Sequence, residues 1–154
     1  MTPTEYRIAN DIMQYRHIGV DCLDACRYIA RDIHHDNGQS FTEPNVSDEV
    51  RVGAIKEGIR RVAGAGKQAL TRLIAFINSP HVGVGTAQKA LDSIFHGVSA
   101  VDLLRESKEL LDTVNVVMRK SEQCSSEKDL ELLASWIDEA VPIYINIRRL
   151  WALV

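Results

Sequence analysis

Apolar residues recur along three segments of the chain at alternating spacings of three and four positions. The first segment carries them at Ile8, Ile12, Tyr15, Gly19, Cys22, Cys26, Ile29 and Ile33, the second at Val52, Ile55, Ile59, Val62, Gly66, Ala69, Leu73 and Phe76, and the last at Leu130, Leu133, Ile137, Ala140, Tyr144, Ile147 and Trp151. This spacing places them on one face of an α-helix, and no segment alternates as a strand would. The pattern predicts long helices over 4–35, 47–78 and 127–152, packed at small crossing angles.

Between the second and the last of these helices, the chain carries two shorter apolar stripes that point in different directions. One consists of Val84, Ala87, Leu91, Ile94 and Val98, and the other of Leu103, Leu110, Val114 and Val117. Gly97, which is typical of a helix end, and the capping pattern Ser99-x-x-Asp102 lie between them, so we expect two helices over 84–97 and 100–120. Pro142 predicts a kink in the last helix or the start of a second piece.

The linkers between the predicted helices are short and polar, which favours antiparallel neighbours. The sequence therefore predicts an all-α fold: an antiparallel bundle of four long helices, the third broken into two, in a single domain over residues 1–154. We expect Ile59, Leu73, Ile137 and either Trp136 or Trp151 in its core.

The composition is that of an ordinary globular protein. The 154 residues carry a net charge of −3, with 45% hydrophobic and 25% charged residues, so charge alone gives no reason to expect nucleic acid as a partner. No apolar run is long enough for a membrane span, and the N-terminal segment lacks the apolar stretch of a signal peptide. Cys22, Cys26 and Cys124 form an odd set that argues against a disulfide framework. These features predict a cytoplasmic protein.

The stretch Val62–Leu70, "VAGAGKQAL", contains a Gly-Lys pair like that of a phosphate-binding loop. Arg61 stands where the loop needs its first glycine, and Gln68 stands where it needs Ser or Thr. The glycines lie in phase with a helical stripe instead, and they make this helix weak on its own. We therefore predict no nucleotide site. A weak but well-patterned helix gains its stability from packing, which favours its release to another partner.

No catalytic or metal-binding pattern is evident. Asp32 and His35, and likewise Asp92 and His96, have helical spacing, but no Glu-x-x-His pair accompanies them. Cys22 and Cys26 lie on the apolar stripe and are interpreted as small buried residues. We therefore expect no enzyme activity, no metal and no cofactor.

The second long helix carries a basic face. Lys56, Arg60 and Lys67 lie together away from the apolar stripe, with Glu57 the only acid between Arg51 and Arg72. Either this is a solvated face balanced by acidic neighbours such as those in 102–112, or it is a patch for an acidic ligand. No aromatic residue interleaves with it, so base stacking is not indicated.

Two stretches resemble the helical bundles of the vinculin, α-catenin and talin group. "IKEGIRRVAGAGKQAL" is similar to helices that those proteins donate to partner bundles, with Gly58 and Gly66 as departures, and "LIAFINSPHVGVGTAQKALDSIFHGVSAVDLL" is similar to a helix, turn and helix of their amino-terminal bundles. The resemblance covers residues 47–151. It implies a non-enzymatic adaptor of the cytoskeletal or adhesion type that binds a partner's amphipathic helix. The expected binding residues are Ile55, Ile59, Val62, Gly66, Lys56, Arg60 and Lys67, and a homo-oligomer is left open.

A second resemblance competes with the first. "CRYIARDI" is similar to a BH3 segment, and "AGKQALTRLIAFI" to the start of the central helix of Bcl-2-like apoptosis regulators. The Asn-Trp-Gly-Arg signature is absent, and "LASWIDEAVP" lacks the expected Gly-Gly-Trp. This alternative implies a preformed groove that binds BH3 helices.

Overall fold

The computed structural model describes residues 2–31 and 47–152, with side chains up to residue 140. Its elements are α1 (Pro3–Arg31), α2 (Asp48–Ile77), α3 (Gly83–Ile94), α4 (Ala100–Glu122) and α5 (Glu127–Ala152). No strand occurs in this part of the chain, so the all-α prediction is confirmed for it. The expected continuation of the first helix to residue 35, including Ile33, lies outside the described residues, as do Asp32 and His35.

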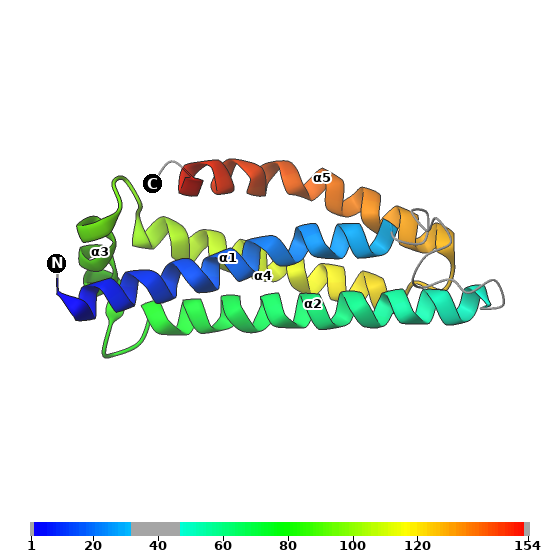
Figure 1. Ribbon diagram of the computed structural model, residues 1–154, viewed down its shortest axis with the longest axis horizontal. Coiled ribbons are helices and arrows are strands. Elements are labelled where there is room, and N and C mark those ends of the chain that lie inside the picture. Colours follow the sequence, from blue (N-terminus) through cyan, green and yellow to red (C-terminus); the bar gives the residue numbers. More distant parts are fainter. Residues whose placement is uncertain (1, 32–46, 153–154) are drawn as a thin grey trace.

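Figure 1 shows α1 and α4 running in one direction along the long axis of the molecule, and α2 and α5 running in the other. The short α3 lies at one end, beside the beginning of α1. Helix α1 packs extensively against α2, and α2 also packs extensively against α4. Helix α5 rests mainly on α1 and makes far less contact with α4.

The helix boundaries follow local capping chemistry. The N–H of Val50 donates to Ser47 Oγ at 3.3 Å, which fixes the start of α2, and the N–H of Asp102 donates to Ser99 Oγ at 3.2 Å at the start of α4. Gly97 has a φ of +76°, which favours glycine, and the predicted break between the two shorter helices is confirmed. Helix α3 ends at Ile94, three residues before its predicted end, whereas α5 continues through Pro142 as one helix.

Among the side chains that the structure describes, the buried apolar residues form two clusters that follow one another along the axis. One contains Ile59, Leu110 and Ile137, and the other contains Ile12, Leu73 and Leu91. Ile59, Leu73 and Ile137 are fully buried as predicted, Trp136 is partly buried, and the side chain of Trp151 lies outside the described residues.

Charged side chains lie at the level where the two apolar clusters meet. Arg16 is only 2% exposed, and its Nη2 donates to Glu106 Oε2 at 2.9 Å. Ser107, the next residue of α4, is fully buried. Burial raises the pKa of the Glu106 carboxyl, although Arg16 acts in the opposite direction. An ion pair between α1 and α4 therefore interrupts the apolar interior.

The buried stripe of α1 departs from the predicted one. Arg16, Leu23 and Ala30 are buried, while Tyr15 and Ile29 are only partly buried. Ala9, Arg16, Leu23 and Ala30 each follow a predicted stripe position by one residue, and all four are buried, so the buried face of α1 is wider than the predicted stripe.

Two glycines allow α1 and α2 to approach closely. A Cβ on Gly66 of α2 would lie 2.2 Å from Cys22 Sγ and 2.6 Å from Cys22 Cβ, and a Cβ on Gly19 of α1 would lie 2.4 Å from Leu70 Cδ2. At Gly53 and Gly64, in contrast, a Cβ would have no neighbour within 4 Å. The glycines of α2 thus differ in role: Gly66 is required by packing, whereas Gly53 and Gly64 face open space.

The difference predicts opposite effects of the same substitution. Gly66→Ala is expected to lower the free energy of unfolding by about 1–3 kcal/mol, because Cys22 Cβ is fixed to the backbone of α1 and cannot move aside. Gly64→Ala is expected to raise it by about 0.5–1 kcal/mol through helix propensity alone. Urea denaturation followed by circular dichroism measures both. Equal effects of the two substitutions would contradict this account of the α1–α2 contact.

Candidate functional site

The apolar residues predicted to bind a partner lie inside the folded molecule. Ile55, Ile59 and Gly66 are buried, and Val62 is partly buried against the cluster that contains Ile59. They face α1 and α4, the two main neighbours of α2. A partner would reach them only after α2 had separated from both helices.

The three basic residues of the predicted site have different surroundings. Lys56 Nζ donates to the carbonyl of Glu122 at 3.1 Å and so ties α2 to the end of α4. Arg60 donates to Glu57 through Nε and Nη2, at 3.0 and 2.7 Å, and this hydrogen bonding lowers the pKa of Glu57. Lys67 is exposed and has no ion-pair partner within the described residues. Glu57 on the same helix therefore partly neutralises the basic face, and among the described side chains no ion pair joins Lys56, Arg60 or Lys67 to residues 102–112.

The Val62–Leu70 stretch is helical throughout, as the sequence predicts. Its backbone N–H groups are directed along the helix axis and cannot surround a phosphate as those of a loop do. Asp92 and His96 are both exposed, and within residues 2–31 and 47–140 no three His, Cys, Asp or Glu side chains come together as metal ligands would.

Cys22 and Cys26 are buried in the α1–α2 contact, where they act as small apolar residues. The Cys22 thiol donates to the Gly19 carbonyl at 3.2 Å. Burial raises the pKa of each thiol to about 12. At neutral pH both are therefore protonated and poor nucleophiles.

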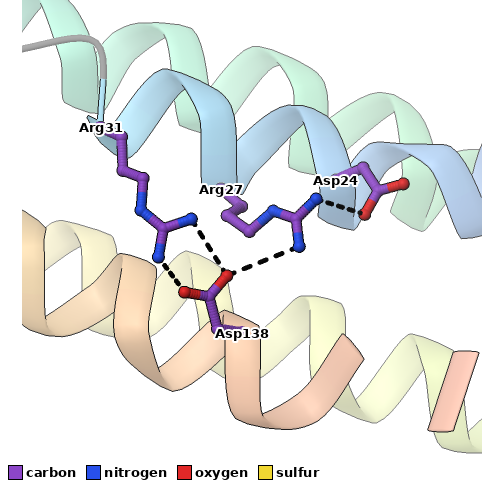
Figure 2. Close-up of polar contacts among 4 residues, drawn as sticks. All are labelled: Asp24, Arg27, Arg31 and Asp138. Carbon is purple, nitrogen blue, oxygen red and sulfur yellow. Dashed lines mark hydrogen bonds and ion pairs between the residues drawn. The ribbon is translucent and has the colours of Figure 1, made fainter. Parts of the chain in front are cut away.

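A polar contact between α1 and α5 is the most developed charged cluster that the structure describes, and Figure 2 shows it. Arg31 binds Asp138 of α5 through both terminal nitrogens, with Nη1 at 3.1 Å from Oδ1. Arg27 Nη1 lies 3.5 Å from the same Oδ1, and Arg27 Nη2 lies 3.4 Å from Asp24 Oδ1. Two guanidinium groups of α1 thus converge on one carboxylate of α5. We call Arg27, Arg31 and Asp138 the α1–α5 clasp.

Sequence reasoning missed this clasp. Each member lies beside an apolar stripe, one position after the buried Cys26, Ala30 or Ile137. A charged residue directly after a buried one is typical of the margin of a contact between two helices. The partners are more than one hundred positions apart, however, and only the folded chain brings them together.

The edge between α4 and α5 is open near the turn that joins the two helices. A cleft of about 370 Å³ lies there, lined by Lys120, Gln123, Cys124, Asp129, Leu132, Leu133 and Trp136. Lys120 Nζ lies 5.3 Å from the centre of a Trp136 ring, and Leu132 is 61% exposed. The cleft offers apolar surface beside a cation, which suits a side chain of an amphipathic partner.

A wider cleft of about 1040 Å³ lies beside the first turns of α2 and α5. Asp48, Glu49, Glu127 and Glu131 line it together with Lys56 and Lys128. Arg51 Nη2 lies 3.5 Å from Glu127 Oε1 and also binds Asp48, so it connects the first turns of the two helices. This cleft combines both signs of charge and indicates no single ligand.

Comparison of the chain with protein-family models, with curated proteins and with solved structures finds no match. The similarities to the vinculin group and to Bcl-2-like proteins therefore rest on the sequence stretches alone. None of the helices in the described part of the chain is long and apolar enough to cross a membrane.

Proposed function

We propose that the protein is a non-enzymatic protein–protein interaction module, an antiparallel bundle of four long helices that binds an amphipathic helix of a partner. The observation that supports it best is the open edge between α4 and α5. At this edge α5 makes less contact with α4 than with α1, and a cleft with the exposed Leu132 and the partly buried Trp136 lies near the turn that joins α4 to α5. Exposed apolar surface beside a groove is typical of sites that bind helices.

The absence of an enzyme activity also belongs to this proposal. The two cysteines of α1 have thiols with pKa values raised to about 12, which disfavours nucleophilic chemistry at neutral pH. An adaptor role of the cytoskeletal or adhesion type follows from the resemblance to the vinculin group. It predicts that the partner contributes a helical segment.

Binding of helical peptides to the full chain tests the proposal. Fluorescently labelled amphipathic peptides, including a set of BH3 peptides, are titrated with the protein and followed by anisotropy. We expect at least one to bind with a Kd in the micromolar range, and Lys120→Glu at the cleft to change that affinity about three- to tenfold. Lys108→Glu, on an exposed part of α4 outside the cleft, is the matched control and should stay within about twofold.

The outcomes separate the alternatives. If no peptide binds at concentrations up to about 1 mM, the interaction module is contradicted. If binding is tight and confined to BH3 peptides, the Bcl-2-like alternative takes first place. If Lys120→Glu and Lys108→Glu have equal effects, the open edge is not the site.

A further inference from the structure

Helix α5 packs mainly against one neighbour, α1. Its contact with α4 is sparser, and a cleft lies near the turn that joins the two helices. Helix α2, in contrast, packs extensively on both α1 and α4, and glycine-mediated close approach adds to its contact with α1. Because each lost helix contact exposes apolar surface, we expect separation of the 127–140 part of α5 to require less free energy than separation of α2.

The surface of α5 that faces the interior has a compact pattern. Leu130, Leu133, Ala134 and Ile137 are buried, at positions i, i+3, i+4 and i+7. Asp138 follows at i+8, at the margin of this stripe, and binds Arg27 and Arg31. The apolar residues hold α5 against the interior, and the carboxylate of Asp138 sets the position of α5 along α1.

The surface beneath α5 is complementary to that pattern. Leu23, Cys26 and Ala30 of α1 belong to the same apolar cluster as Val114 and Val117 of α4. Arg27 and Arg31 lie beside this apolar surface and point at Asp138 (Figure 2). Without α5, the groove between α1 and α4 would present apolar residues beside two guanidinium groups, which prefer a carboxylate.

We propose that this groove is the binding site for the helix of a separate partner protein, and that α5 occupies it as an intramolecular competitor. The partner helix carries apolar residues at i, i+3, i+4 and i+7 and an aspartate or glutamate at i+8. It displaces α5 from the open edge and takes the place of Asp138 between Arg27 and Arg31. This inference rests on the proposed function of helix binding and adds a site beneath α5, which differs from the surface cleft between α4 and α5.

A peptide with the sequence of residues 126–140 serves as the probe. It is labelled with fluorescein and titrated with the full chain. Wild-type protein is expected to bind it weakly, because its own α5 competes at high effective concentration. Asp138→Asn in the protein weakens that competitor, so this variant should bind the probe about three- to tenfold more tightly than wild type. Glu139→Gln, at an exposed position of α5, is the matched control and should stay within about twofold.

The reverse set of substitutions tests recognition of the carboxylate. A probe with Asp138→Asn should bind the Asp138→Asn protein about three- to tenfold more weakly than the unchanged probe, whereas a probe with Glu139→Gln should not differ. With both Arg27→Gln and Arg31→Gln added to the protein, the two probes with and without the carboxylate should bind alike. Thermal melting by circular dichroism confirms that each variant is folded; Arg31 and Asp138 side chains are 34% and 36% exposed, so folding should persist.

Hydrogen exchange of the unmodified protein gives an independent measurement. Amides of 127–140 should exchange faster than those of 52–73, and Asp138→Asn should accelerate exchange in 127–140 alone. Faster exchange in α2 than in α5 overturns the inference and favours release of α2. Equal affinity of wild type and Asp138→Asn for the probe overturns it as well. If other helical peptides still bind in that case, the proposed function stands without this site.

A second copy of the chain is the competing occupant. Sedimentation of the wild-type and Asp138→Asn proteins over a range of concentrations distinguishes it. A monomer in both supports a separate partner. A concentration-dependent dimer that the unlabelled peptide dissociates assigns the groove to α5 of another copy, and overturns the proposal of a separate partner.

Discussion

Replacing Arg16 with methionine is expected to lower the free energy of unfolding by about 3 kcal/mol at pH 7. Arg16 is 2% exposed and holds Glu106 at 2.9 Å, and the Glu106 side chain is itself 23% exposed. Methionine retains most of the apolar contacts of the arginine stem but leaves the carboxylate without its cation. The residual contact of Glu106 with water keeps the loss at the lower end of the range for buried ion pairs. Urea denaturation measures it.

The loss should depend on pH in a defined direction. Burial raises the pKa of Glu106 above its ordinary value near 4.5, and Arg16 opposes this rise. A carboxyl with a raised pKa in the folded state favours folding at low pH, and this contribution is lost as the pH rises through the folded value. Because Arg16→Met raises the pKa of Glu106 further, its destabilisation should be smaller at pH 5 than at pH 7.

Two further variants complete this experiment. Arg16→Met combined with Glu106→Gln removes both charges and should recover more than half of the lost stability. Arg105→Met breaks the exposed pair with Asp102, whose nitrogen–oxygen distance is also 2.9 Å, and should cost less than about 0.5 kcal/mol. A loss of that small size for Arg16→Met would show that the buried pair makes no net contribution.

The second large loss of stability is expected when buried apolar side chains are truncated. Ile59→Ala and Leu73→Ala are each expected to cost about 2–5 kcal/mol, because both side chains are fully buried and neighbouring helices cannot close the cavity completely. Ile59 belongs to one apolar cluster and Leu73 to the other, so the pair tests both halves of the interior. Calorimetric melting or urea denaturation measures the change.

Val50 and Val101 provide the controls for these truncations. They are 61% and 57% exposed, and Val50→Ala and Val101→Ala should change stability by less than about 0.5 kcal/mol. If Ile59→Ala unfolds one end of the molecule while Leu73→Ala unfolds the other, the two clusters are separate cooperative units. One common transition for both variants would show that the two clusters, which meet at the Arg16–Glu106 ion pair, unfold together.

The sequence by itself determined the secondary structure and most of the interior. Apolar spacing placed Ile59, Leu73 and Leu91 on buried helix faces, and Ser47, Gly97 and Ser99 marked helix boundaries. These features are local, since they depend on helix period, on side-chain to backbone hydrogen bonds one turn away and on backbone conformation at a glycine. They can therefore be derived without knowledge of which helices are neighbours.

Only the tertiary structure decided which faces meet and what is left open. Arg16 and Glu106 are 90 positions apart, and the arginines of the α1–α5 clasp are still farther from Asp138, so their pairing depends on helix order and rotation. The same holds for the glycines of α2, which look alike in the sequence, although a Cβ at Gly66 would collide with Cys22 and a Cβ at Gly64 would have no neighbour within 4 Å. Such contacts arise from the relative placement of distant segments, which the spacing of residues within a helix does not encode.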